Sequence, residues 1–380
     1  MAGRIALLKA VDSLLGRIAV PLACLLRPSA NLPDRITSIL VIRPGGIGDA
    51  VLLIPALQAL RSRNPDAKIT VLAERRNASA FLLCSGVNSI LCYDRPGGLI
   101  AALAGVYGVV MDAEQWHRLS AVVARLTRAP MLIGFATNER SRLFTHPITY
   151  SQDDYEVDSF QHLLTPLDID PVQPARKFLA VPAAAARKGE ELMASLDNRA
   201  FVTIFPGASI PERRWGADNF RKVADLLALL GVAVVVVGGN GDKGEGEAIV
   251  AGTTGLNLAG RTSLSETAAV IQRGSLLLSG DSGVLHIAVG LGIPTVSLFG
   301  PGRALKWAPR GEHHTVVAKG LPCSPCTTFG TTPACPIGAQ CMRDITVDEV
   351  FNAVTVLLTA TGGLPSSCCK KDWIEITAPS

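Results

Sequence analysis

The feature that most constrains this chain is a strand-like run that leads through a glycine-rich turn into a helical pattern. The run is 38–41, the turn 43–49 reads Arg-Pro-Gly-Gly-Ile-Gly-Asp, and the helical pattern is 50–60. Glycines let a backbone approach a ligand closely, and a helix N-terminus offers free N–H groups. The carboxylate of Asp49 would repel a phosphate, but it suits a site that takes a proton from a hydroxyl.

Strand patterns separated by helical patterns continue along the chain, which implies a parallel, doubly wound sheet. The pattern stops in a Pro- and Ala-rich zone and then restarts, so we expect two such sheets. With 380 residues and 48% apolar composition, the chain can bury a core in each half. The predicted strands are 38–41, 68–73, 89–93, 108–112 and 131–134, then 201–205, 232–237, 276–278 and 295–298.

We therefore predict an α/β protein with two Rossmann-like domains that face a cleft. Ligands of such sheets bind just beyond the carboxyl ends of the strands. The predicted boundaries are an N-terminal helix at 1–36, a first domain at 37–170, a connection at 171–198, a second domain at 199–365 and a tail at 366–380.

Three turns of the second half could converge on one ligand: 206–209, 238–242 and 279–286. The last turn opens a helical pattern, and a helix N-terminus favours a phosphate. Simple capping of that helix by Ser282 is the alternative. Arg213 and Arg214 could neutralise a diphosphate, and solvated surface arginines are the alternative for them.

The N-terminal segment is apolar but interrupted by charges. Its longest uncharged run, 18–26, is too short to cross a bilayer. The helical wheel predicts an amphipathic helix on a membrane surface, and a helix packed on the first domain is the alternative. A signal peptide is disfavoured because Asp12 and Arg17 interrupt its apolar region. One face carries Lys9, Asp12, Ser13 and Gly16, and the other carries Leu7, Leu8, Val11, Leu14, Leu15 and Ile18.

Four of the nine cysteines lie close together in the sequence, as Cys323, Cys326, Cys335 and Cys341. A Cys-x-x-Cys pair followed by two more cysteines suggests a structural zinc site. Free or redox-labile thiols and disulfides are the alternatives, and disulfides would be disfavoured in a reducing compartment. The net charge of +4 is too small to indicate a nucleic-acid partner.

Taken in order, several stretches resemble the heptosyltransferases of lipopolysaccharide core synthesis, glycosyltransferase family 9. The resemblance runs from about 38 to 360. It implies a GT-B fold, with an ADP-heptose donor bound mainly by the second domain and a lipid-linked oligosaccharide acceptor bound by the first. It also implies a cytoplasmic enzyme, peripheral on the bacterial inner membrane. The stretches are 43–49, 55–57, 206–209, 213–215, 281–286 and 298–301.

The resemblance also implies roles for individual residues. Asp49 matches the family's catalytic carboxylate, and Arg213 matches its phosphate-binding basic residue. Gly280 departs from the family, which often has Asn there. The expected donor-binding residues are Pro206, Gly207, Ala208, Ser209, Arg213, Gly239, Asp281, Ser282, Gly283 and His286. For the acceptor we expect Gly46, Gly48, Asp112, His117 and Arg118, with surface polar residues as the alternative for the last three.

The expected activity is inverting, metal-independent transfer of a heptose from ADP-heptose to a lipopolysaccharide core acceptor. An Asp-x-Asp pair occurs once, at Asp168 and Asp170, inside the connection. Arginines and helix dipoles are therefore expected to stabilise the leaving group, and no catalytic cofactor is required. Two alternatives stay open. One is an NAD-dependent oxidoreductase, with Glu74 as the ribose-binding acid. The other is a non-catalytic glycan-binding member of the same fold.

Overall fold

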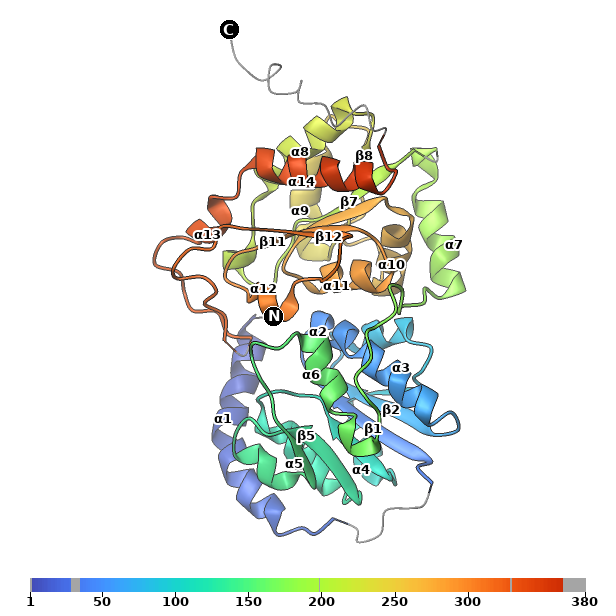
Figure 1. Ribbon diagram of the computed structural model, residues 1–380, viewed down its shortest axis with the longest axis vertical. Helices are drawn as coiled ribbons and strands as arrows, with labels where there is room; N and C mark the ends of the chain where they lie inside the picture. The colour runs from blue at the N-terminus through green and yellow to red at the C-terminus, as the bar shows by residue number, and fades with distance from the viewer. Residues whose placement is uncertain (1, 29–34, 198, 329, 365–380) are drawn as a thin grey trace. The chain divides into compact units, whose positions relative to one another are not determined.

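The computed structural model describes residues 2–28, 35–197, 199–328 and 330–364. The predicted tail at 366–380 and the side chains of residues 2–9 lie outside the described part. The chain divides into two compact units, Met1–Ala180 and Val181–Ser380 (Figure 1).

The first unit is built on a parallel sheet of six strands in the order β3-β2-β1-β4-β5-β6. β1 and β2 are buried along nearly their whole length, as strands covered on both faces must be. The edge strand β6 was not predicted, because it is short and contains Pro147. The strands are β1 (Ser38–Arg43), β2 (Lys68–Ala73), β3 (Ser89–Cys92), β4 (Val109–Asp112), β5 (Met131–Phe135) and β6 (His146–Ile148).

Helices connect these strands. The helical pattern after the glycine turn forms two helices that meet at Leu53, because Pro55 occupies the first turn of the second. The α-helices are α1 (Ala2–Cys24), α2 (Ile47–Leu52), α3 (Ile54–Arg63), α4 (Gly98–Ala104), α5 (Arg118–Leu126) and α6 (Glu156–His162). The 3₁₀ turns are η1 (Ala78–Leu83), η2 (Glu139–Leu143) and η3 (Thr165–Leu167).

The second unit repeats this topology. Its six parallel strands run in the order β12-β11-β10-β7-β8-β9. In both sheets the first strand of the unit therefore lies between the second and the fourth. The strands are β7 (Phe201–Phe205), β8 (Ala233–Val236), β9 (Leu256–Asn257), β10 (Leu276–Gly280), β11 (Thr295–Phe299) and β12 (His314–Ala318).

The helices of the second unit cover its sheet and enclose a core rich in Val and Leu. The α-helices are α7 (Ala183–Leu192), α8 (Ala217–Leu229), α9 (Lys243–Val250), α10 (Leu264–Arg273), α11 (Gly283–Gly290), α12 (Ala304–Trp307), α13 (Gln340–Arg343) and α14 (Val347–Ala360). The 3₁₀ turns are η4 (Ala194–Leu196), η5 (Pro211–Arg213) and η6 (Asn240–Asp242).

Each strand order has a switch point, between β1 and β4 in the first sheet and between β7 and β10 in the second. Ligands of doubly wound sheets bind at the carboxyl ends of the strands beside such points. β1 and β4 end at Arg43 and Asp112, while β7 and β10 end at Phe205 and Gly280. The glycine turn and the turn at 279–286 thus leave their sheets at the switch points.

Helix α1 packs on α5 and η2 of the first unit (Figure 1). Asp12 and Gly16 face that unit, whereas Leu14 and Ile18 are 69% and 59% exposed. The alternative of a helix packed on the first domain is therefore confirmed, and it is Asp12 and Gly16 of the predicted polar face that make this contact. In the described part of the chain no helix is long and apolar enough to span a membrane.

Candidate functional site

The carboxylate of Asp49 lies in the first turn of α2 at the switch point of the first sheet. Its Oδ2 accepts a hydrogen bond of 2.8 Å from Arg43 Nη2, and its side chain keeps 27% of its surface exposed. The turn reaches this position through Gly45, whose φ of +108° few other residues adopt. Of the predicted acceptor residues, Gly46 and Gly48 lie beside this carboxylate.

Arg43 is a buried cation that links several elements. Its Nη1 donates to the carbonyl oxygen of Ala113 at 2.5 Å and to Gln115 Oε1 at 2.9 Å. A second carboxylate, Glu114, lies 4.0 Å away. Burial alone would lower the pKa of Arg43, but the carboxylates of Asp49 and Glu114 raise it above its ordinary value. The guanidinium therefore stays charged and fixes the position of Asp49.

The support for Arg43 comes from residues far along the chain. Gln115 Nε2 donates to Glu156 Oε1 at 2.5 Å, and the hydroxyl of Tyr150 donates to Glu156 Oε2 at 3.0 Å. Burial, and then the charge of Glu156, raise the pKa of Tyr150, so it remains a donor. The guanidinium of Arg43 also lies 5.6 Å from the ring centroid of Phe160. The sequence reasoning missed Gln115, Tyr150 and Glu156, because no local motif marks them.

Glu74 does not have the surroundings of a ribose-binding acid. Its Oε2 accepts the N–H of Gly45 at 3.3 Å and lies 2.9 Å from Arg76 Nε. Asn77 ties the same segment to the turn, because its Nδ2 donates to the carbonyl of Arg43 at 3.0 Å. A pyrophosphate would need the N–H that Glu74 already occupies. Glu74 is therefore already engaged by the glycine turn and by Arg76 in this structure.

Two of the predicted acceptor residues are buried. Asp112 has no exposed surface and pairs with the equally buried Arg140. Desolvation raises the pKa of Asp112 despite that partner. Arg118 is only 8% exposed, and its Nε lies 2.6 Å from Glu139 Oε1. Both therefore hold the first unit together and offer little surface to an acceptor, contrary to expectation.

His117 is the more exposed member of this group, but it turns toward α1. Its Nδ1 lies 3.5 Å from Asp12 Oδ2. The same Asp12 carboxylate accepts the backbone N–H groups of Arg118 and Leu119 at 3.1 and 2.8 Å, so it caps α5. His117 thus contacts Asp12 of α1, and the sequence did not indicate this contact.

In the second unit, Arg213 Nη1 and Asp281 Oδ2 are 2.9 Å apart at the switch point. The arginine is 16% exposed and the aspartate 8%. Trp215 anchors this segment: its Nε1 donates to the carbonyl of Ile345 at 2.9 Å, and its ring meets Phe220 edge-on at 5.0 Å. The predicted phosphate-binding arginine is therefore rigidly placed beside the predicted donor turn.

Ser282 caps α11, because its Oγ accepts the N–H of Leu285 at 3.2 Å. The capping alternative is therefore confirmed for this side chain, although a cap satisfies only part of the unpaired N–H groups at a helix start. Gly302 approaches the turn so closely that a Cβ there would lie 2.2 Å from Asp281 Oδ2. His286 is 3% exposed, so it offers little surface to a donor, contrary to expectation.

Asp242 brings the turns at 206–209 and 238–242 together. Its Oδ2 accepts the N–H of Gly239 at 2.8 Å, and a Cβ on Gly207 would lie 2.6 Å from its Oδ1. Arg214 pairs with Glu245 and lies 3.9 Å from Asp242. The two arginines therefore differ in their acidic neighbours. Arg214 contacts Glu245 and lies near Asp242, whereas Arg213 pairs with Asp281 of the donor turn.

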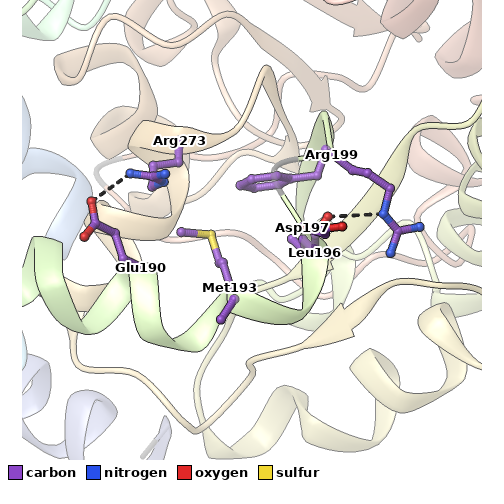
Figure 2. A pocket seen from close by; sticks show the side chains of 8 residues that line it. Glu190, Met193, Leu196, Asp197, Arg199 and Arg273 are labelled. Atoms are coloured by element: carbon purple, nitrogen blue, oxygen red, sulfur yellow. Dashed lines mark hydrogen bonds and ion pairs between the residues drawn. The ribbon is translucent and has the colours of Figure 1, made fainter.

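A cavity of about 490 Å³ lies in the second unit, away from these turns (Figure 2). It is lined by Met193, Leu196 and Phe201, and an ion pair of 2.9 Å joins Glu190 and Arg273 beside them. Phe201 is the first residue of β7, so this cavity lies at the amino ends of the strands. It is at the wrong edge of the sheet for a doubly wound fold to bind its ligand.

The four clustered cysteines line one small cavity near α13. Cys323 is exposed while Cys341 is buried, and no group of three or more potential ligands among the described residues could hold a metal ion. A tetrahedral site needs every sulfur about 2.3 Å from one ion. All seven described cysteines are free thiols. The described residues of this segment thus show free thiols and no disulfide, and the structural zinc site stays a prediction.

Comparisons with known proteins identify the family of the chain. The family model described as glycosyltransferase family 9 (heptosyltransferase) matches residues 98–334. A lipooligosaccharide heptosyltransferase 2 of Haemophilus influenzae is 24% identical over 74% of this chain and 88% of its own length. A lipopolysaccharide heptosyltransferase 3 of Escherichia coli is 27% identical over 69% and 83%.

Among solved structures, the ADP-heptose lps heptosyltransferase II of E. coli superposes with a TM-score of 0.70 at 22% identity. The superposition covers 86% of this chain and 100% of that one. At this identity the likeness bears on the fold, and it confirms the predicted fold class.

Proposed function

The chain belongs to glycosyltransferase family 9 (heptosyltransferase), and from that premise we propose that it moves a heptose from ADP-heptose to a lipopolysaccharide core acceptor. Membership of the family makes the chain a glycosyltransferase and excludes the oxidoreductase alternative. The donor and the acceptor are proposed because the similar proteins are named for them.

The observation that carries the proposal is the ion pair between Asp49 and Arg43. A base must be ionised, reachable and fixed in place. Arg43 provides the one hydrogen bond to the Asp49 side chain in the described part of the chain, so Oδ1 remains for a substrate hydroxyl. In the proposed reaction the acceptor oxygen bonds to the anomeric carbon of the donor, its proton goes to Asp49, and ADP leaves.

We propose a single displacement, which inverts the anomeric configuration. A single displacement needs one carboxylate base. It forms no covalent intermediate, so it needs no second carboxylate as a nucleophile and no water to release the sugar. The charge that develops on the diphosphate would be stabilised by Arg213 and by the N-terminus of α11. Asp281 would hold the arginine toward the diphosphate from 2.9 Å. With a guanidinium and a helix dipole in these roles, the transfer proceeds without a divalent metal.

We also propose that the enzyme works in the cytoplasm, on the inner-membrane surface where a lipid-linked acceptor is reached. Free thiols at all seven described cysteines fit a reducing compartment.

A donor screen tests the proposed function. The full chain is incubated with ADP-, UDP- and GDP-sugars and a core acceptor, and the released nucleotide is measured. ADP release that requires both ADP-heptose and acceptor, and that persists in EDTA, is expected. Release of UDP or GDP would overturn the donor assignment, and strict Mg²⁺ dependence would overturn the metal-free mechanism. Asp49→Asn is the inactive control.

A further inference from the structure

Helix α1 presents a continuous row of large apolar side chains to solvent. These residues, called here the apolar stripe, are Leu14, Leu15, Ile18, Leu22 and Leu25, and they are 51% to 80% exposed. At about 100° per residue they share one face of the helix. Single exposed leucines are ordinary, but a contiguous apolar patch marks an interaction site.

Contacts on the opposite face hold the stripe outward. Asp12 caps α5 from α1 through two backbone N–H groups, at 3.1 and 2.8 Å. Gly16 lies so close to the first unit that a Cβ there would be 2.7 Å from Arg118 Cβ. Val20 and Ala23 belong to the core of that unit. Rotating α1 to hide the stripe would break the cap and force larger side chains into the space at Gly16.

The charges on α1 and on the elements against which it packs are predominantly basic. Exposed arginines lie on these elements or just past their ends. Arg17 lies on α1 and Arg142 in η2, while Arg27 and Arg128 lie just past the ends of α1 and α5. The acids of the same region are engaged: Asp12 caps α5, and Glu139 pairs with Arg118. The hydrogen bond from Arg118 lowers the pKa of Glu139, and the charge of Arg17 contributes in the same direction.

We propose that the apolar stripe of α1 docks the first unit on the surface of an anionic lipid bilayer. A row of exposed apolar side chains accompanied by exposed arginines suits the boundary between acyl chains and lipid phosphates, which needs no shaped pocket. The Asp12 cap keeps α1 on its unit, so the helix lies in the interface and does not cross it. This inference deepens the proposed function, since it rests on an acceptor that is itself an amphiphile.

Flotation of the full chain with vesicles tests this directly. Wild type should bind vesicles of phosphatidylethanolamine and phosphatidylglycerol, and should bind neutral phosphatidylcholine vesicles and high-salt samples less. The double variant Ile18→Gln/Leu22→Gln should lose about tenfold or more in vesicle affinity. Leu229→Gln is the matched control, because it removes an equally exposed leucine, 70% exposed, from α8 of the second unit. Its binding should equal that of wild type.

Further measurements separate the outcomes. Circular dichroism and transfer to a delipidated, soluble acceptor should be unchanged in the double variant, since Ile18 and Leu22 are 59% and 62% exposed. Failure of wild type to float would overturn the inference, and so would a wild-type dimer that becomes monomeric in the double variant, because the stripe would then join two copies. Vesicle binding without ADP release would overturn the proposed function alone.

Discussion

Arg43 Nη2 lies 2.8 Å from Asp49 Oδ2, so the last residue of β1 holds the carboxylate in the first turn of α2. The strand, the glycine turn and the helix thereby form one rigid unit around the proposed base. The arginine is only 1% exposed, so water does not compete for its hydrogen bonds.

Replacing Asp49 by Asn should abolish transfer while leaving ADP affinity nearly unchanged. The amide oxygen can still accept the bond from Arg43, so the turn keeps its shape, but it cannot take a proton. The rate with acceptor should fall by about 10²–10⁴-fold. Steady-state transfer and calorimetry with ADP check the two halves of this prediction. A rate within tenfold of wild type would remove Asp49 from the role of base.

Arg213→Ala should weaken ADP binding by about 1.5–3 kcal/mol, the usual value of a hydrogen bond to a charged group. Arg214→Ala is the matched control. It removes the neighbouring arginine, which pairs with Glu245, and should change affinity much less. Calorimetry on both variants gives the comparison. Equal losses would mean that the pairings seen without ligand do not predict which arginine meets the diphosphate.

Arg140→Met should destabilise the first unit by about 3–5 kcal/mol, because it leaves the buried carboxylate of Asp112 without its cationic partner. Adding Asp112→Asn to that variant should restore part of the loss, since the uncompensated charge disappears. Denaturant unfolding of the single and double variants measures both effects. A single variant as stable as wild type would show that water reaches Asp112.

The contribution of Glu349 to stability should depend on pH. A hydrogen bond from Lys319, and then the Thr346 cap, lower the pKa of Glu349 from 4.5 to about 2. Because the folded pKa is the lower one, the stabilisation is fully present above about pH 4.5 and is lost as the pH falls toward about 2. Since the carboxylate is 44% exposed, Glu349→Gln should cost no more than about 1 kcal/mol at neutral pH.

Denaturation midpoints of wild type and Glu349→Gln across this pH range give the test. The two curves should converge in acid. A difference that stays constant down to about pH 2 would assign the effect to packing of the side chain instead of its charge.

The clustered cysteines should react with a maleimide in order of exposure, Cys323 first and Cys341 last. The thiolate is the reactive form, and burial raises the pKa of the Cys341 thiol. Mass spectrometry of timed samples, with and without a chelator, reads the order. A chelator that accelerates the labelling of all four would reveal a bound metal and contradict the free-thiol description.

Buried strands of the sheets were the most predictable part of the fold. The bounds 68–73 and 201–205 match β2 and β7, because strands covered on both faces read as nearly continuous apolar runs. The edge strands β6, β9 and β12 were missed. They are short or partly exposed, and their pairing with a neighbouring strand defines them more than their own residues do.

The site was predictable only where a local motif marks it. Asp49 and Arg213 follow from turns next to strands, whereas the support for Arg43 reaches 72 residues to Gln115 and from there 41 residues to Glu156. Such distant contacts have no periodicity to reveal them. The orientation of α1 had the same limit, since a wheel separates two faces but cannot show that Asp12 finds a helix to cap.

The matching strand orders have a consequence for how the chain is made. In both units the first strand pairs with the fourth, and that fourth strand is β4 in one sheet and β10 in the other. As the chain leaves the ribosome, the centre of the first sheet cannot close until residue 112 has emerged, and that of the second waits for residue 280. The half that carries Asp49 therefore has its strands available while the other is still being translated. Parallel strands pair non-locally, which makes them slow to form. The nascent chain therefore has to form such pairs twice in succession, each time within one unit instead of across the whole chain.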